Sequence, residues 1–248
     1  MSLKDKTVLI TGGGTGLGAD MARGFANAGA DVWIAGRSPD TLARVADPHD
    51  NIRTVTVDVT DETAVGAMFD FTGPADIVIA NAGTSMSAPM TATTTEQWSA
   101  MLDVNLTGTF LTFRAALRRM KGRDWGRLIA VASTAGIKGY PYVSAYCAAK
   151  HGVVGLTRAL AQECARGGIT VNALCPGFLD TDMTTRSIAN IVDKTGMSAQ
   201  DARGNLERMS PQNRLIDPSE VTTAALWLCG EGSHGITGQT ISISGGEA

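Results

Sequence analysis

The sequence predicts an α/β fold, a doubly wound parallel sheet with helices on both faces. Apolar segments rich in β-branched residues alternate with segments of helical periodicity along all 248 residues. A glycine-rich turn joins the first apolar segment to the first helical one. Strands separated by helices form right-handed β-α-β units, which build parallel sheets. We find no internal repeat or linker, and we expect a single domain over residues 1–248.

The predicted strands are short and apolar, and seven segments fit this description. Several consist almost entirely of Val, Ile, Leu and Thr, as in TVLIT and IRTVTV. Such runs are typical of strands that are covered on both faces. In chain order the predicted strands are Thr7–Thr11, Asp31–Gly36, Ile52–Val57, Asp76–Ala80, Arg127–Ala132, Ile169–Cys175 and Gln239–Ile243.

The predicted helices begin at residues suited to capping. The first has apolar residues at helical spacing over Leu17–Ala28, and Gly29 is suited to end it. Ser38-Pro39 begins the second as N-cap and first helical residue. Three later helices are predicted: one from the capping box Thr93-x-x-Glu96 to about Met120, one from Ser144 to about Arg166, and one capped by Asp217-Pro218-Ser219-Glu220.

A long polar stretch containing methionines, Leu179–Leu215, follows the sixth predicted strand and contains no clear strand. Ligands of doubly wound sheets bind beyond the carboxyl ends of the strands. We therefore predict that this stretch is a lid over the site, and a solvated surface insertion is the alternative.

Composition limits the classes of function. Lys and Arg number 21 and Asp and Glu 24, so the net charge of −3 argues against a dedicated nucleic-acid binder. No apolar run approaches the length of a membrane span. The first strand follows the N-terminus closely, so we expect no signal peptide and a cytoplasmic protein. The four cysteines form no C-x-x-C pair, and we expect reduced thiols and no metal site.

The turn after the first strand, Thr11-Gly-Gly-Gly-Thr-Gly-Leu-Gly18, is typical of a dinucleotide site. Gly12, Gly16 and Gly18 let the backbone turn tightly and let a pyrophosphate approach amide groups at a helix N-terminus. No Gly-Lys-Ser/Thr sequence follows, which excludes a Walker loop.

The end of the second strand favours NADP(H) over NAD(H). Many NAD binders carry an acidic residue there to accept a hydrogen bond from the ribose 2′-hydroxyl. This chain has Arg37, which can pair with a 2′-phosphate. Asp58 and Val59, after the third strand, are expected at the adenine, and Asn81-Ala82-Gly83, after the fourth, along the ribose and adenine.

Three side chains that follow the fifth strand in the sequence suggest acid–base chemistry. Ser133 ends that strand, and Tyr146 and Lys150 follow it on one helix, spaced by four residues. Residues at this spacing share a helix face, so the ammonium is expected to lower the pKa of the phenol. Tyr146 would then exchange a proton with a substrate oxygen that Ser133 polarises.

These motifs together resemble the short-chain dehydrogenase/reductase family over nearly the whole chain. The resemblance also includes Asn105, Pro176-Gly177 and Thr181. It implies a Rossmann-type sheet of seven strands and an Asn105–Ser133–Tyr146–Lys150 tetrad. In the family the Asn distorts its helix and holds a relay water, Lys150 also bonds the nicotinamide ribose, and Thr181 the carboxamide. Ala80 stands where members often have a first Asn.

The cofactor is expected to be held by residues from several of these motifs. They are Gly12, Thr15, Gly16, Leu17, Gly18, Arg37, Asp58, Val59, Asn81, Ala82, Gly83, Tyr146, Lys150, Pro176, Gly177 and Thr181.

The segment Ser144–Met183 is most similar to 3-oxoacyl thioester reductases and polyketide ketoreductases. In the bacterial fatty-acid enzymes two Arg residues dock the acyl carrier, but Asp124 and Gly167 stand at those positions here. Arg123 and Arg166 lie next to them, which leaves coenzyme A thioesters open as substrates. The nearby basic residues, which are either phosphate contacts or a solvated helix end, are Arg118, Arg119, Lys121 and Arg127.

The sequence best supports the prediction of an NADP(H)-dependent reductase of a 3-oxoacyl thioester, whose acyl group is carried by coenzyme A or an acyl carrier protein. A polyol, sugar or secondary-alcohol dehydrogenase of the same family is the alternative. A non-catalytic protein that senses dinucleotides is a more distant one. The resemblance implies a homotetramer, with the helices at 93–120 and 144–166 pairing across one interface and the C-terminal segment in another.

Overall fold

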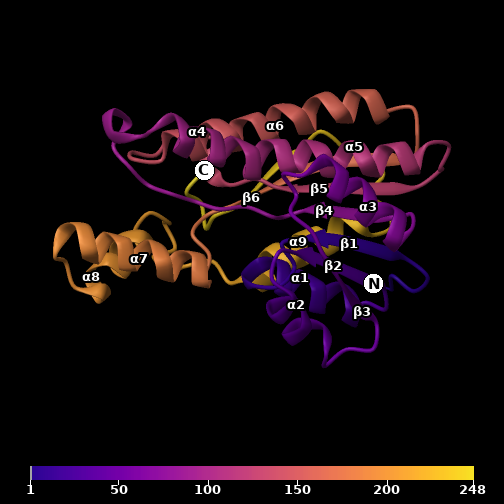
Figure 1. The fold of residues 1–248 in the computed structure, drawn as a ribbon, viewed down its shortest axis with the longest axis horizontal. Helices are drawn as coiled ribbons and strands as arrows, with labels where there is room; N and C mark the ends of the chain where they lie inside the picture. The colour runs from indigo at the N-terminus through magenta and orange to yellow at the C-terminus, as the bar shows by residue number, and fades with distance from the viewer. Residues whose placement is uncertain (1) are drawn as a thin grey trace.

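The computed structural model describes residues 2–248, whose strands form one seven-stranded parallel sheet (Figure 1). The order across the sheet is β3-β2-β1-β4-β5-β6-β7, as expected for the Rossmann-type arrangement. Every predicted strand is found, with ends that differ by one residue at most. The strands are β1 (Thr7–Thr11), β2 (Asp31–Gly36), β3 (Ile52–Thr56), β4 (Ile77–Ala80), β5 (Gly126–Val131), β6 (Ile169–Pro176) and β7 (Thr240–Ile243).

Helices cover both faces of the sheet, because successive strand residues point to opposite sides. In β1, Val8 and Ile10 belong to one apolar core and Leu9 to the other. The first core includes residues of α1 (Gly16–Asn27), α2 (Pro39–Ala46) and α9 (Pro218–Cys229). The second includes residues of α3 (Glu62–Thr72), α5 (Gly108–Met120) and α6 (Ser144–Cys164). In Figure 1 α5 and α6 lie along the top of the molecule, and α1 and α2 lie in its lower part beside β2 and β3.

Two of the predicted caps are confirmed. Ser38 Oγ accepts a hydrogen bond from the Thr41 amide at the start of α2. The Asp217 carboxylate accepts one from the Ser219 amide at 2.8 Å, and Glu220 completes a capping box for α9. The predicted helices do not include α3, although Asp61 caps it.

The single long helix predicted up to Met120 is wrong in two respects. Its capping box lies one residue later, at Thr94 and Gln97, because the Thr93 hydroxyl instead donates to the Pro89 carbonyl at 3.1 Å. The helix is also interrupted: α4 (Thr95–Leu102) is followed by a π-helical turn over Asp103–Thr107, and α5 begins after it.

The stretch predicted to be a lid folds as two helices, α7 (Asp182–Thr195) and α8 (Ala199–Glu207). They extend away from the sheet to the left in Figure 1. At their base Leu179 pairs with Ile216 in an isolated parallel bridge. Asn190 Nδ2 of α7 donates to Ser87 Oγ at 2.9 Å, which joins the two helices to the loop after β4.

None of the helices found within residues 2–248 is long and apolar enough to cross a membrane.

Candidate active site

The predicted site residues gather along the carboxyl edge of the sheet. The glycine-rich loop follows β1, and Asn81-Ala82-Gly83 follows β4, its neighbour in the sheet. Ser133 follows β5, and Gly177 follows β6. The chain leaves β1 toward β2 on one side and reaches β4 on the other, so the strand order reverses between these two strands. Doubly wound sheets bind their ligands at this position.

The glycine-rich loop has the backbone that a pyrophosphate cradle needs. Gly12 and Gly16 have φ values of +66° and +50°, in the left-handed region that favours glycine. A Cβ at Gly18 would lie 2.1 Å from the Gly12 carbonyl oxygen, so α1 packs directly against the loop. Thr15 begins α1 without a side-chain cap, which leaves the first helical amides available to an anion. The loop therefore fits the dinucleotide expected from the sequence.

Asn81 braces this loop from the neighbouring strand. Its Nδ2 donates to the carbonyl oxygens of Thr11 and Gly12 at 3.0 and 3.1 Å. Thr11 Oγ1 accepts in return from the amides of Asn81 and Ala82, both at 3.1 Å. Thr11 is not among the predicted site residues, because no local pattern indicates a hydrogen bond to a residue 70 positions away.

Arg37 and Asp58 lie near each other at the outer end of the cradle. Arg37 is exposed just after β2. Asp58 Oδ1 accepts from the Thr60 amide at 2.9 Å and from the Thr60 hydroxyl at 2.8 Å. These hydrogen bonds, with a smaller contribution from Arg37, hold the pKa of Asp58 below its ordinary value. A carboxylate and a guanidinium thus lie at the place predicted for the adenosine. Val59 is buried, and a Cβ at Gly108 would lie 2.7 Å from its side chain.

Lys150 is buried beneath the site. Its side chain lies on α6, one turn after Tyr146, and the residue is 4% exposed. Its Nζ donates to the Val131 carbonyl oxygen at 2.8 Å and lies 5.6 Å from the centre of the Tyr146 ring. Burial lowers the pKa of Lys150 to about 8.

Tyr146 is half-buried, and its surroundings oppose ionisation. Burial raises the pKa of Tyr146 to about 12, although a hydrogen bond with Ser133 acts in the opposite direction. The prediction that Lys150 lowers the pKa of Tyr146 is therefore wrong for this structure, because desolvation of the phenolate is the larger effect. At neutral pH the phenol keeps its proton, which is the form that an acid needs. Ser133 Oγ itself accepts from the Ala135 amide at 3.1 Å.

Asn105 lies in the π-helical turn between α4 and α5 and is fully buried. Its Nδ2 donates to the carbonyl oxygens of Met101 at 2.9 Å and Thr84 at 3.0 Å, and its Oδ1 accepts from the Thr84 amide at 3.2 Å. A Cβ at Gly83 would lie 2.8 Å from Asn105 Oδ1 and 3.6 Å from Lys150 Nζ. The helix distortion implied by the family resemblance is present, and it brings Asn105 close to Lys150.

The far side of the cradle is formed by residues after β6. Pro176 ends this strand, and the Gly177 amide donates to the Ile243 carbonyl oxygen at 3.0 Å. Thr181 begins α7, and its side chain would lie 3.5 Å from a Cβ at Gly16. The base of the two-helix segment therefore borders the glycine-rich loop.

The basic run near Arg123 does not reach this site. Arg127 is 0% exposed and its guanidinium donates to backbone carbonyls, so it cannot contact a phosphate. Arg123 pairs with Asp76 at 3.0 Å. Arg123 and Ser133 flank opposite ends of β5, whose six residues span about 20 Å. These cations are close to Ser133 in the sequence, but they lie at the amino edge of the sheet, opposite the predicted site. They therefore cannot bind a substrate phosphate there.

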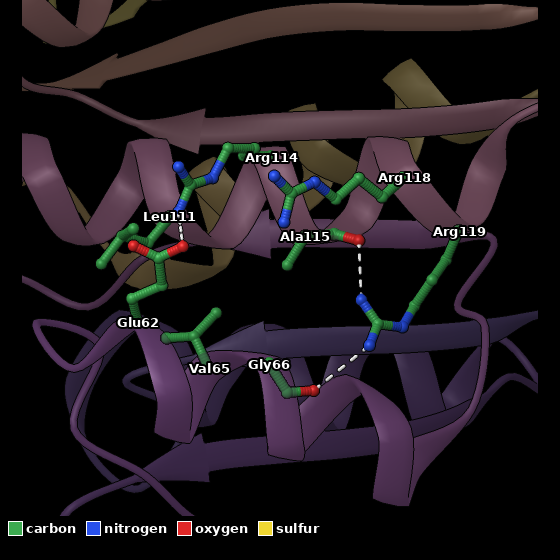
Figure 2. A pocket seen from close by; sticks show the side chains of 8 residues that line it. All are labelled: Glu62, Val65, Gly66, Leu111, Arg114, Ala115, Arg118 and Arg119. Carbon is green, nitrogen blue, oxygen red and sulfur yellow. Dashed lines mark hydrogen bonds and ion pairs between the residues drawn. The ribbon is translucent and has the colours of Figure 1, made fainter.

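Two hollows lie outside the predicted site. One of about 120 Å³ separates α3 from α5 (Figure 2). Its Arg119 donates to the carbonyl oxygens of Ala115 and Gly66, and its Arg114 pairs with Glu62. Arg119 and Arg114 are thus already hydrogen-bonded or ion-paired, and Arg118, which also lines the hollow, is exposed. The other, of about 800 Å³, runs between α5 and α6 and is lined by Phe110, Leu117, Leu156 and Leu160 among others.

A family model described as short chain dehydrogenase matches residues 6–191. D-beta-hydroxybutyrate dehydrogenase of Rhizobium meliloti is 35% identical over 252 residues, covering 97% of this chain and 98% of the relative. A 3-oxoacyl-(acyl-carrier-protein) reductase of Vibrio cholerae is 34% identical, covering 99% and 98%. A crystal structure of an actinorhodin polyketide ketoreductase variant with NADPH matches with a TM-score of 0.93 and 32% identity, covering 100% of this chain and 99% of that chain.

Proposed function

The chain belongs to the short-chain dehydrogenase family of NAD(P)-dependent oxidoreductases that act on CH–OH groups, and we propose that it reduces 3-oxoacyl thioesters with NADPH. The observation that carries the reaction type is the group formed by Ser133, Tyr146 and Lys150 beside the glycine-rich loop. Relatives named for 3-oxoacyl and polyketide ketones support the substrate class. In this proposal residues 1–248 form one dinucleotide-binding domain, and residues 179–215 are its lid.

The cradle residues would hold the cofactor along the carboxyl edge of the sheet. The first amides of α1, with Gly12, Thr15, Gly16, Leu17 and Gly18, would bind the pyrophosphate. The nicotinamide, when bound, supplies the hydride that reduces the ketone carbon. The other proposed contacts come from Arg37, Asp58, Val59, Asn81, Ala82, Gly83, Tyr146, Lys150, Pro176, Gly177 and Thr181.

The residues around Tyr146 would complete the reduction at the ketone oxygen. The Tyr146 hydroxyl donates its proton to that oxygen, and the Ser133 hydroxyl donates a hydrogen bond that holds the oxygen in place. Lys150, charged below its pKa of about 8, stabilises the phenolate that Tyr146 becomes. Asn105 supports the proton relay by holding the turn beside Lys150.

Arg37 is the proposed determinant of the cofactor preference. A charge-assisted bond to the 2′-phosphate contributes on the order of 1.5–3 kcal/mol, so NADPH should bind about tenfold to a hundredfold more tightly than NADH. Arg37→Asp should reverse this order. Fluorescence titration of both cofactors measures it, with Arg53→Asp, the same charge change on β3, as the control. Equal affinities of the two cofactors for the unmodified protein would refute the assignment.

The thioester substrate is proposed from the relatives and from the lid. The lid carries half-buried apolar side chains, which could cover an acyl chain: Met183, Ile188, Ile191, Val192 and Met197. Arg186 is exposed on α7 and is the cation we now assign to a coenzyme A phosphate, in place of Arg123 and Arg127.

Acetoacetyl-CoA should therefore be reduced with NADPH. Its KM should rise about two- to fivefold in Arg186→Ala and rise with added salt, while kcat changes little. The KM of acetoacetyl-N-acetylcysteamine, a thioester without phosphates, should not respond. Arg118→Ala, an exposed cation at the opposite edge, is the matched control. Oxidation of sugars or simple alcohols with no reduction of either thioester would overturn the proposal.

A second candidate is a dehydrogenase of a short free hydroxy acid. The hydroxybutyrate dehydrogenase relative, at 35% identity, favours it. Reduction of free acetoacetate with a lower KM than acetoacetyl-CoA would support this candidate over the thioester.

We also propose a cytoplasmic homotetramer. The apolar groove between α5 and α6, with Phe110 40% exposed, supports a further buried face there. Light scattering should then give about four times the 25.8 kDa mass of one chain, and the mass of a single chain would contradict the proposal.

A further inference from the structure

A chain of hydrogen bonds joins the C-terminal segment to the residue after Ser133. Tyr140 Oη lies 2.7 Å from Thr134 Oγ1 and 2.6 Å from Glu247 Oε1. Lys138 Nζ lies 3.1 Å from the same Glu247 oxygen. A phenol has one proton and a carboxylate can only accept. Tyr140 therefore donates to Glu247, and the Thr134 hydroxyl donates to Tyr140.

The Glu247 side chain is buried, although it lies one residue from the C-terminus. It is 2% exposed. Burying a carboxylate is unfavourable unless hydrogen bonds and an opposite charge compensate for the lost water, and here Tyr140 and Lys138 do so. The hydrogen bond to Glu247 contributes to a raised pKa of Tyr140, second to burial. A chain end that was merely solvated would leave this carboxylate in water.

Two glycines turn the chain so that Glu247 can reach inward. After β7, Gly245 and Gly246 have φ values of +62° and +91°, which other residues rarely adopt. A Cβ at Gly245 would lie 2.4 Å from Ser210 Oγ, and one at Gly246 would lie 3.5 Å from Pro211. The C-terminal hook, residues 244–248, thus packs on the chain that leaves the lid. In Figure 1 the C-terminus lies on the side of the sheet from which α7 and α8 extend.

The same network borders the substrate side of the site. Glu247 Oε2 would lie 3.3 Å from a Cβ at Gly177, directly after β6. The Tyr140 ring packs edge-to-face on Phe178, with ring centres 6.2 Å apart. Thr134 is 2% exposed and precedes Ala135, whose amide donates to Ser133 Oγ. A shift of Thr134 would therefore move the donor that orients the Ser133 hydroxyl.

We propose that Glu247 is a positioning residue, which acts through Tyr140 and Thr134 to hold the Ser133 hydroxyl in its reactive orientation. The inference rests on the proposed role of Ser133, but not on which ketone is the natural substrate. Glu247 touches neither substrate nor cofactor in this role. The C-terminal hook would then have a role in catalysis as well as in packing.

The kinetic test compares Glu247→Ala with Glu247→Gln, which keeps an oxygen acceptor for Tyr140. We expect Glu247→Ala to lower kcat at least about tenfold, since a misplacement of about 1 Å can cost up to about 10²-fold. NADPH affinity should stay within about twofold, because the glycine-rich loop after β1 lies several strands away from β7, which Glu247 follows, and Glu247→Gln should restore most of kcat. Glu231→Ala, an exposed carboxylate nearby in sequence, is the control and should behave as the unmodified protein.

Two further measurements distinguish positioning from a loss of general stability. Tyr140→Phe and Glu247→Ala should be non-additive, the double variant resembling either single one, because both break the same chain. Hydrogen–deuterium exchange of the protein without cofactor should rise over residues 134–143 and stay constant over β1 and α1. An unchanged kcat, additive effects, or exchange raised equally everywhere would each overturn the inference. The exchange measurement needs no substrate, so it stands even if no thioester is reduced.

Discussion

Replacing Tyr146 by phenylalanine will lower kcat by at least about 10²-fold. The variant keeps the aromatic ring and loses the hydroxyl proposed to donate a proton to the ketone oxygen, and general acid catalysis contributes about 10²- to 10⁴-fold. With a pKa near 12 the hydroxyl is protonated at neutral pH, so the loss should be largest in the direction of reduction. Consumption of NADPH with acetoacetyl-CoA, or with any ketone that the protein reduces, measures the effect.

The control for this variant lies four residues earlier. Tyr142 is 63% exposed, and Tyr142→Phe should leave kcat within about twofold of the unmodified protein. Cofactor titration should give nearly the same NADPH affinity for both variants, because the phenylalanine ring preserves the packing. If Tyr146→Phe retained close to full turnover, Tyr146 would have no part in the proton transfer.

Arg127→Ala will lower the free energy of unfolding by about 3–5 kcal/mol. The guanidinium is fully buried and donates to the carbonyl oxygens of Leu228 at 3.1 Å, Gly126 at 2.9 Å and Gly168 at 3.3 Å. It also donates to His234 Nδ1 at 3.2 Å, which must therefore be the unprotonated ring nitrogen. Unsatisfied buried acceptors cost about 1–3 kcal/mol each, and the cavity adds to this.

Urea denaturation measures this loss, and a fall in Tm of about 10 °C or more should accompany it. Arg118→Ala is the matched control: it removes the same side chain from an exposed position on α5, and its effect should stay within about 0.5 kcal/mol. Equal stabilities of the two variants would show that the buried guanidinium does not hold the amino end of β5 to the end of α9 and to His234. Because Arg127 lies far from Ser133, kcat of the folded variant should be unchanged.

Local patterns in the sequence determined the sheet and predicted the cradle and the proposed reacting group. Strand residues such as Val8 and Ile10 are apolar because both faces of the sheet are covered, and this is visible without a structure. Gly12 and Gly16 are required by backbone angles that other residues adopt rarely. Tyr146 and Lys150 are four residues apart, and the helix alone puts them on one face.

Only the tertiary structure decided the environment of those groups. Whether Arg127 is a surface cation or a buried one depends on the end of α9, about a hundred residues away. The pKa of Tyr146 is raised because the folded chain removes water from the phenol, which outweighs the expected effect of Lys150. The bond of Glu247 to Tyr140 joins residues 107 positions apart. Burial and long-range pairing arise from the whole fold, and no short window of residues encodes them.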